Sequence, residues 1–398
     1  MAPYRYIERL TPVAAATAAL FAAVPAAAQP PQGLELSAPR LVAKGAAIDV
    51  KGRGAVPGDR VQIQVRLKDG RWAHLAAVKA NQSGRFGRAV RPKKARRRFV
   101  LRATTTAGAI SNRVRIRTRP VVLAAVGDIN LGNGPGAVMA LRGFRHPWTS
   151  VAPSLRAADV AFGNLECAVS TRGAPVPKEF NFRGPPAALR VMARFAGFDV
   201  LNLANNHAGD YGTAALLDTV KYVRRFGMTP VGAGRSLDAA AKPRIVERLG
   251  LRIAFVGFSN ILPSSFFAAP GRAGTQPATT QLIEAGVRRA GRRADVVIAT
   301  FHWGVERATT EDARQRAFAA TALEAGADAV IGAHPHVLQP IRRNGSRLVA
   351  YSLGNFVFGA SSSVTARTGI LRLKLSASGI EGARLAPAVI EGTRPRLL

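Results

Sequence analysis

Cysteine is nearly absent from this chain of 398 residues, since Cys167 is the single one. One cysteine excludes an internal disulfide, and its distance from the N-terminus excludes the lipid-anchored class, which needs a cysteine at the leader boundary. We expect Cys167 to be a small buried side chain rather than a nucleophile. Long apolar runs are also absent after the first thirty residues. The sequence therefore predicts no membrane span beyond them.

Acidic residues are scarce, with 23 Asp and Glu against 57 Lys and Arg and a formal net charge of +34. This imbalance favours association with a polyanion such as nucleic acid, a wall polymer or an acidic capsule. The densest basic run, residues 91–99, lacks the interleaved aromatic side chains that stack on bases. Because arginine is spread over the whole chain, a solvated face is the preferred interpretation of that run.

The first residues have the pattern of an export signal. Arg5 and Arg9 precede an apolar, alanine-rich run at 13–24, and three alanines at 26–28 form a small-residue cleavage site. We expect a signal peptide over residues 1–28, with the mature protein secreted or in the cell envelope; an uncleaved anchor is the alternative. Export argues against nucleic acid as a partner.

Residues 34–119 alternate polar and apolar side chains in short stretches separated by turn signals such as Pro57-Gly58-Asp59. A period of two with regular turns predicts a small all-β sandwich, immunoglobulin-like in type. This segment has no visible chemistry, and a wall-binding module, a spacer and a docking site for a partner are all open.

From residue 121 to 358 buried-strand runs alternate with amphipathic helical segments, which indicates an α/β domain. Helices are expected at 213–226 and 310–325, the second with Thr309 and Asp312 spaced like a capping box. Residues 359–398 are expected to be a C-terminal β extension that completes the domain. The predicted strands are 121–126, 159–162, 198–203, 252–258, 295–300, 327–331 and 347–351.

Polar side chains gather where these predicted strands end, and four of the six histidines are among them. Loops at the carboxyl ends of strands share one edge of an open α/β sheet, so residues far apart in sequence should converge there. The residues concerned are Asp128, Asn130, Asn164, Glu166, Asn205, Asn206, His207, Asp210, His302, Glu306, His334, His336 and Asn355.

Mixed carboxylate, imidazole and amide ligands suit a divalent ion such as Mn, Zn or Fe, and two such ions can clamp a phosphoryl group. Each motif alone is more often a structural histidine or ordinary turn chemistry, but several at successive strand ends favour a metal site. His334 and His336 in an extended segment would point the same way, with Pro335 stiffening the segment. A hydrogen-bonded histidine pair in a polar loop is the alternative.

Several motifs together resemble the CapA family of bacterial capsule synthesis proteins, in the order expected over residues 121–358. They are Gly-Asp-x-x-Leu-Gly (127–132), Gly-Asn-Leu-Glu (163–166), Asn-Leu-Ala-Asn-Asn-His-x-x-Asp-Tyr-Gly (202–212), His-Trp-Gly-x-Glu (302–306), Gly-Ala-His-Pro-His-Val-x-Gln (332–339) and Tyr-Ser-Leu-Gly-Asn-Phe-x-Phe (351–358).

The resemblance implies a calcineurin-like metallophosphoesterase fold, a four-layer αββα sandwich, and a role in the synthesis or export of poly-γ-glutamate capsule beside membrane capsule-synthesis proteins. It implies one or two divalent ions held by Asp128, Asn130, Asn206, His302, His334 and His336, with Glu166 or Asn164 in the bridging position. His207 would be the general acid, held by Asp210. We expect the remaining polar residues of the motifs, Asn205, Glu306 and Asn355, to contact substrate.

The chain departs from the usual phosphoesterase pattern at two ligand positions. Asp128-Ile-Asn130 stands where such enzymes have Asp-x-His, and Asn164 or Glu166 stands where they have a bridging aspartate. An amide binds a divalent cation more weakly than imidazole or carboxylate. The sequence therefore predicts the fold more firmly than catalytic activity.

Two functions follow as hypotheses. The first is a metal-dependent hydrolase that acts on a phosphoester or an amide of an envelope polymer, with His207 giving a proton to the leaving group. The second is a non-catalytic envelope factor that binds an anionic polymer through its basic surface. A dinucleotide site at Val231–Gly234 lacks the third glycine, and no Gly-x-Ser-x-Gly elbow of a serine hydrolase occurs.

Overall fold

The computed structural model describes residues 33–92 and 97–398. The predicted signal peptide, residues 1–28, lies outside these ranges. Within them, no helix is long and apolar enough to cross a membrane.

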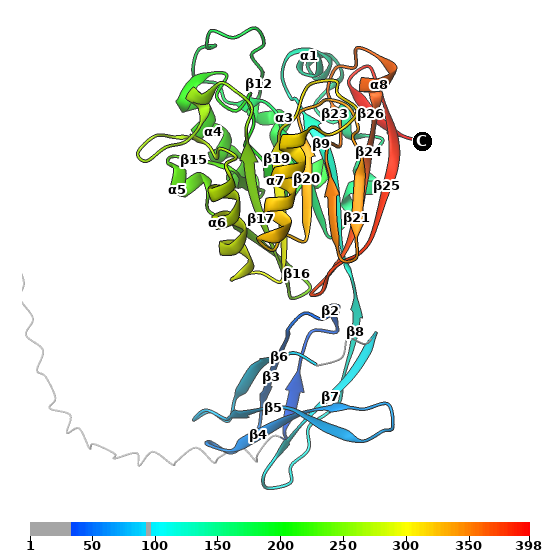
Figure 1. Ribbon diagram of the computed structural model, residues 1–398. Helices are drawn as coiled ribbons and strands as arrows, with labels where there is room; N and C mark the ends of the chain where they lie inside the picture. The colour runs from blue at the N-terminus through cyan, green and yellow to red at the C-terminus, as the bar shows by residue number, and fades with distance from the viewer. Residues whose placement is uncertain (1–32, 93–96) are drawn as a thin grey trace, which may run out of the picture.

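The N-terminal part of the chain forms a β-sandwich around its own apolar core (Figure 1). Sheet III has the strand order β1-β3-β6 and sheet IV the order β2-β8-β7-β4-β5. A sandwich is therefore present, whereas its immunoglobulin-like type stays a prediction. The strands are β1 (Glu35–Ser37), β2 (Leu41–Ala43), β3 (Ile48–Arg53), β4 (Arg60–Arg66), β5 (Trp72–Lys79), β6 (Phe86–Val90), β7 (Arg98–Thr105) and β8 (Val114–Arg119).

Two larger sheets follow, and they pack face to face. Sheet I has the order β14-β13-β10-β9-β24-β25-β26, with β23 also paired to β9, and sheet II has the order β16-β17-β19-β20-β22-β21. The strands of sheet I are β9 (Val121–Ile129), β10 (Val160–Leu165), β13 (Val200–Asn202), β14 (Thr229–Val231), β23 (Asn355–Val357), β24 (Arg367–Ser376), β25 (Gly379–Glu391) and β26 (Arg394–Leu397). Those of sheet II are β16 (Arg244–Arg248), β17 (Leu251–Ser259), β19 (Val296–His302), β20 (Ala329–Ala333), β21 (Ile341–Asn344) and β22 (Arg347–Ala350).

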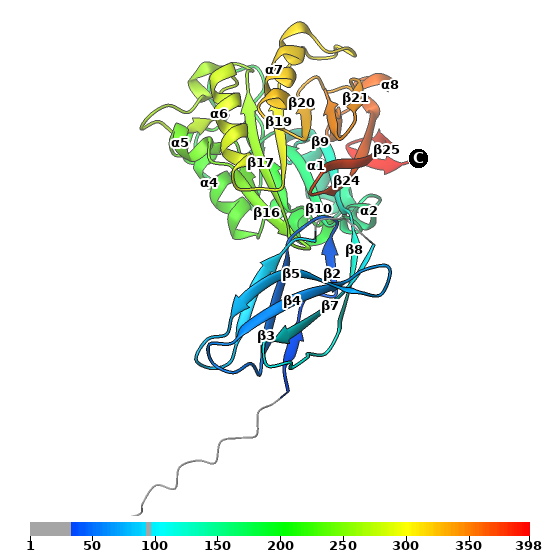
Figure 2. The ribbon, with the colours of Figure 1, turned by 60° about the horizontal axis from the view of Figure 1, so that its bottom comes forward.

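Alternation of side chains along the strands builds three apolar layers. Leu123 and Ala125 of β9 face the core between the sheets, whereas Ala124 and Val126 face a helical layer outside sheet I. A second helical layer covers sheet II through α6 and α7. The result is the helix–sheet–sheet–helix arrangement expected from the family resemblance (Figures 1 and 2).

Helices and short pairs connect these strands. The helices are α1 (Asn133–Arg142), η1 (His146–Trp148), α2 (Ala152–Arg156), α3 (Pro186–Val191), η2 (Met192–Ala196), α4 (Gly212–Arg225), α5 (Leu237–Ala240), η3 (Ser264–Phe266), α6 (Thr280–Gly291), α7 (Ala313–Glu324) and α8 (Ser363–Ala366). Two further pairs join β11 (Ala168–Val169) to β12 (Arg183–Gly184), and β15 (Ala233–Gly234) to β18 (Gly274–Thr275).

The predicted strands of the α/β part all occur, most with shifted ends, but the capping box was placed one turn too early. The side chain of Asp312 accepts from Gln315 N, and the Gln315 side chain accepts from Asp312 N, so α7 begins at Ala313. Thr309 lies outside this reciprocal pair because the chain is not yet helical there. Cys167 is buried as predicted, and burial raises the pKa of its thiol to about 12.

The sandwich contacts the α/β part through backbone and charged groups. Ala43 N donates to Leu249 O over 2.7 Å, and Lys44 pairs with Glu381 at 2.7 Å. Arg119, at the end of β8, holds both carboxylate oxygens of Asp159, at 2.6 and 2.7 Å. Because β9 starts only two residues after Arg119, this pair fixes the direction in which β9 leaves the sandwich.

Gly127 is needed for a close backbone approach. β9 continues without a turn through Gly127 and Asp128 to Ile129. A Cβ at Gly127 would lie 1.8 Å from Gly354 O, and Asp128 N donates to that same carbonyl over 2.9 Å. The absence of a side chain at Gly127 therefore lets the segment before β23 lie against β9.

Replacing Gly127 by alanine should destabilise the fold by about 3 kcal/mol, because the clash is with backbone that cannot rotate away. Chemical denaturation followed by circular dichroism measures the effect. Gly134→Ala in α1 is the matched control, since a Cβ there meets nothing within 4 Å, and it should leave stability unchanged or raise it by up to about 1 kcal/mol. Equal stabilities of the two variants would contradict the close-approach interpretation.

Candidate functional site

The polar residues predicted at the strand ends do converge. Asp128 lies near the end of β9, Glu166 follows β10, His302 ends β19 and His334 follows β20. Both sheets therefore contribute to one group of side chains, which we call the carboxylate–histidine cluster: Asp128, Glu166, His302, His334 and His336. Asp128, Glu166 and His302 are fully buried.

Glu166 is the centre of the cluster. Its Oε1 lies 3.3 Å from His302 Nε2, 3.9 Å from His336 Nε2 and 4.0 Å from His207 Nε2. Neither carboxylate oxygen has a hydrogen-bond partner among the residues that the structure describes, although both are buried. Burial first, and then the neighbouring charge of Asp128, raise the pKa of Glu166 well above its usual value.

Asp128 is held by groups from β10 and from the segment that follows β20. Its Oδ1 accepts from Asn164 Nδ2 at 2.7 Å, and its Oδ2 accepts from His334 N at 3.1 Å. His336 Nδ1 lies 3.3 Å from Oδ2 and 2.8 Å from Asn355 Oδ1. Burial alone would lower the pKa of His336, but the charges of Glu166 and Asp128 raise it to about 10.

His334 and His336 converge by a different backbone route from the one predicted. β20 ends at Ala333, and φ is 99° at His334 and 59° at His336, so the segment is a turn with left-handed residues. The extended geometry was therefore wrong, although the two rings lie 5.8 Å apart. Burial and the neighbouring histidines lower the pKa of His334 and of His302 well below the usual value, which keeps both rings neutral.

A network of amides supports these groups. Asn164 Nδ2 also lies 3.1 Å from His302 Nδ1, and Asn164 Oδ1 accepts from Asn202 Nδ2 at 2.8 Å. Asn206 Oδ1 lies 2.7 Å from His302 Nε2. Asn164 thus turns its nitrogen toward Asp128, and its oxygen is already engaged.

Three predicted site residues lie at the margin of the cluster. Asn130 Oδ1 accepts from Gly132 N at 2.8 Å, and Asn205 bonds the backbone of Leu165 and of His207, so both side chains support local loops. Glu306 is exposed at the rim, where its carboxylate comes close to His334 and His336.

His207 is held on three sides. Its Nδ1 lies 2.6 Å from Asp210 Oδ2, and its ring stacks on Phe182 with centroids 4.0 Å apart. Lys178 Nζ donates to Asp210 Oδ1 at 2.6 Å and to Asn206 O at 2.5 Å. With Nδ1–H directed at Asp210, Nε2 is the nitrogen that faces Glu166. Burial lowers the pKa of His207 despite the opposing effect of Asp210.

Sequence reasoning missed Lys178 and Phe182. Both lie in the irregular segment between β11 and β12, away from any strand end that topology would bring to the site. A lysine and a phenylalanine there have no periodicity or spacing that distinguishes them from ordinary loop residues. Only the fold brings them against His207.

Three overlapping sets of residues could each hold a metal ion, because within each set the ligand atoms lie within 4.8 Å of one another. The sets are Glu166, His302 and His334; Asp128, Glu166 and His336; and Glu306, His334 and His336. Glu166 belongs to the first two sets. His334 Nδ1, like the Glu166 oxygens, is buried and has no hydrogen-bond partner within residues 33–92 and 97–398. Buried acceptors are normally satisfied, so these orphaned atoms fit a divalent cation.

Comparison with known proteins points to one family. The family model described as bacterial capsule synthesis protein PGA_cap matches residues 122–360. The chain is 33% identical over 273 residues to the PGA biosynthesis protein CapA of Bacillus subtilis (strain 168), covering 68% of this chain and 72% of that protein. It is 30% identical over 285 residues to the capsule biosynthesis protein CapA of Bacillus anthracis, covering 69% of each.

Solved structures are only distantly similar. The NAD nucleotidase NadN of Haemophilus influenzae aligns with a TM-score of 0.42 and 13% identity over 68% of this chain. The chain spans about half of that structure, 56% of its length. A structure described as PhoD aligns with a TM-score of 0.31 and 11% identity, covering 92% of this chain and 91% of that one. Scores of this size support no argument about function.

Lys178→Met should destabilise the protein by about 3 kcal/mol, because the buried carboxylate of Asp210 loses its cation. Denaturant unfolding measures the change, and Lys68→Met, an exposed lysine outside the site, should stay within about 0.5 kcal/mol of wild type. The double variant Lys178→Met/Asp210→Asn should be more stable than the sum of the single changes. Strict additivity would mean that the two groups do not interact.

Proposed function

Because the chain belongs to the bacterial capsule synthesis protein family, we propose that it acts in the synthesis or export of a capsule polymer, with poly-γ-glutamate as the first candidate. The names of the Bacillus relatives, PGA biosynthesis protein and capsule biosynthesis protein, support this role. We further propose that it acts outside the cytoplasm, after export by the predicted signal at residues 1–28, beside membrane capsule-synthesis proteins.

We propose that the carboxylate–histidine cluster is a metal site of the metallophosphoesterase type. The observation that supports it most is Glu166, a buried carboxylate with two unpartnered oxygens among histidines. Asp128, Glu166 and His336 would hold one ion, and Glu166, His302 and His334 a second, with Glu166 rather than Asn164 shared between them. Mn, Zn and Fe suit these ligands, and such ions polarise a phosphoryl or carbonyl oxygen and activate water.

The surrounding residues would position the substrate and move a proton. His207 keeps Nδ1–H on Asp210, so Nε2 can take up a proton and, from the doubly protonated ring, give that proton to a leaving group. The lowered pKa of His207 makes that proton easy to release. Lys178 and Phe182 hold the ring in place. Glu306 and Asn355, at the rim and beside His336, would contact the substrate.

A second candidate function is binding of an anionic polymer without cleavage. The net charge of +34 supports it, and so do the departures at Asn130 and Asn164, whose oxygens are engaged within the protein. The two functions differ in one requirement, since only hydrolysis needs the metal site.

Elemental analysis by inductively coupled plasma mass spectrometry tests the metal site. The purified full chain supplied with Mn or Zn should retain one or two equivalents, and His334→Ala/His336→Ala should lose them because each proposed ion loses a ligand. His74→Ala/His146→Ala removes the same number of histidines outside the cluster and should retain the metal. A wild type that stays empty after loading would exclude the metal site and favour polymer binding.

Activity on model phosphoesters tests the proton donor. His207→Ala should lower turnover by about 100-fold to 10,000-fold at unchanged metal content, as expected for loss of a general acid. His74→Ala is the control and should keep full activity. If Asp128→Ala and His207→Ala both match the metal-loaded wild type on every substrate, hydrolysis at this site is wrong.

The capsule role needs a test in cells. In a strain deleted for this chain, we expect less polymeric glutamate after acid hydrolysis of the capsule, with restoration by the wild-type chain. Complementation by His334→Ala/His336→Ala would separate the two candidate functions, since a binding factor without chemistry needs neither ligand. Unchanged polymer in the deletion strain would contradict a role in its synthesis or export.

A further inference from the structure

Sheet IV of the sandwich has an unusual charge pattern. Its strands, β2, β4, β5, β7 and β8, contain no aspartate or glutamate. Sheet III differs, because Glu35 pairs with Arg53 and Asp49 with Lys51. The basic residues in the strands of sheet IV are Arg60, Arg66, Lys79, Arg98, Arg102, Arg115, Arg117 and Arg119.

Strand alternation gathers several of these arginines on one face. Phe99 and Leu101 of β7 and Ile116 of β8 point into the sandwich core. Their neighbours Arg98, Arg102, Arg115 and Arg117 must then project from the opposite, outer face of the sheet. Arg98, Arg115 and Arg117 are exposed there.

The strand register places like charges opposite each other. Arg98 of β7 is directly paired with Arg117 of β8, and Arg115 lies opposite Val100 on the same strands. Like charges in directly opposed positions destabilise a sheet. Among the described residues no carboxylate forms an ion pair with Arg98, Arg115 or Arg117, whereas the next outward residue, Arg119, is paired with Asp159. An anion bound along this face would offset the repulsion between these guanidinium groups.

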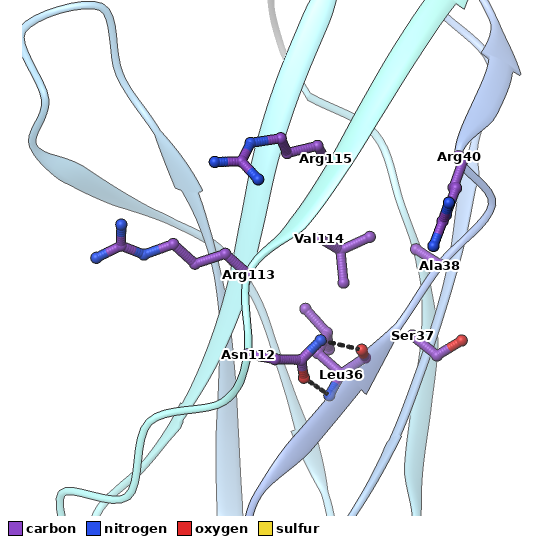
Figure 3. A pocket seen from close by; sticks show the side chains of 8 residues that line it. All are labelled: Leu36, Ser37, Ala38, Arg40, Asn112, Arg113, Val114 and Arg115. Atoms are coloured by element: carbon purple, nitrogen blue, oxygen red, sulfur yellow. Dashed lines mark hydrogen bonds between the residues drawn. The ribbon is translucent and has the colours of Figure 1, made fainter.

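The same face continues around Trp72. The guanidinium of Arg102 lies 4.2 Å from the ring centroid of Trp72 and donates to Gln64 at 2.8 Å, and Arg113 lies 5.9 Å from the same centroid. In Figure 3 the side chains of Arg113 and Arg115 leave their strand on the side away from Leu36. Both arginines also line the hollow of about 460 Å³ beside Leu36, where Asn112 makes two hydrogen bonds with the backbone of Leu36.

We infer that this arginine face, formed by Arg98, Arg102, Arg113, Arg115 and Arg117, binds an extended polycarboxylate chain. The choice of carboxylate rests on the proposed function, and the cationic site rests on the geometry. Guanidinium groups bind carboxylates through two parallel hydrogen bonds. Outward residues on a strand recur about every 6.7 Å and neighbouring strands lie about 4.8 Å apart, so the arginines form a ladder that a linear polyanion can follow.

Other polyanionic partners fit this face less well. A nucleic acid that binds through single strands needs exposed aromatic platforms, and Trp72 is already covered by Arg102. A membrane surface favours apolar side chains that insert between lipids, and Leu41 is the single large exposed apolar residue on the described strands of sheet IV. The family model begins at residue 122, so the arginine face lies outside the part that the family shares.

Binding of the full chain to poly-γ-glutamate tests the inference. Arg98→Gln/Arg115→Gln/Arg117→Gln should bind the polymer about tenfold more weakly than wild type. The slope of the logarithm of the binding constant against the logarithm of the salt concentration should become shallower by about two to three. Arg289→Gln/Arg292→Gln/Arg293→Gln removes the same charge from exposed positions in and just after α6 and should bind within about twofold of wild type. Equal weakening of the two variants would overturn a localised site.

A charge reversal separates binding from folding. Arg117→Glu should raise the melting temperature, because the new carboxylate faces Arg98, and should weaken polymer binding at the same time. A variant that is less stable, or that binds as tightly as wild type, would overturn the inference.

Two further measurements separate the arginine face from the metal site and identify the class of ligand. His334→Ala/His336→Ala should bind the polymer like wild type, so that the arginine face can hold even if the metal site fails. Vesicles containing phosphatidylglycerol and duplex DNA should bind more weakly than poly-γ-glutamate at equal salt. Tighter binding to either, lost in the sheet variant, would overturn the polycarboxylate assignment.

Discussion

The burial of Glu166 is the constraint on which the site depends. An ionised carboxylate deep in a protein is strongly unfavourable unless a cation or hydrogen-bond donors compensate it. Here no donor in the described part of the chain reaches either oxygen, and the neighbouring carboxylate of Asp128 adds repulsion. The nearby His302 and His334 are kept neutral by burial, whereas the pKa of His336 is raised to about 10, so His336 is the charged histidine beside Glu166. Such a group of acceptors is costly for folding alone, and this cost is what makes a divalent cation the natural complement.

The two sheets bring this group together through close backbone contacts. Gly127 lets β9 approach Gly354, and Gly332 lets β20 approach Tyr351, where an added Cβ would lie 1.9 Å from the carbonyl oxygen. These contacts bind the segment 351–354, which crosses from sheet II to sheet I, to both sheets. The backbone N–H of His334 consequently donates a hydrogen bond to Asp128 Oδ2 over 3.1 Å. A fold with side chains at either glycine would have to separate the two halves of the site.

Much of this arrangement could be predicted because parallel strands deliver their carboxyl ends to a shared edge. That rule placed Asp128, Glu166, His302 and His334 together from sequence. It did not extend to residues whose role depends on side-chain direction: Asn130 and Asn205 occupy motif positions, yet their amides bond nearby backbone. The rule also could not predict that Lys178 and Phe182 contact the site, because an irregular segment has no periodicity from which its path can be derived. The backbone of His334 and His336 was misjudged for a related reason, since positive φ at a non-glycine residue has no sequence signature beyond the motif itself.

The arginine face and the cluster lie at opposite ends of β9, since β9 begins directly after β8 and carries Asp128 near its far end. The junction between them is held by Arg119 with Asp159, Lys44 with Glu381 and Arg91 with Asp295. In this junction arginine and lysine have carboxylate partners, so the excess positive charge is not distributed evenly. Pairing at the junction fixes the sandwich on the α/β part, and the unpaired arginines are left on the outer face of sheet IV. A linear polyanion held there would be oriented relative to the α/β part through these ion pairs, with its remaining length free to extend over the molecule. The length of the polymer would then determine whether one polymer chain can reach both surfaces.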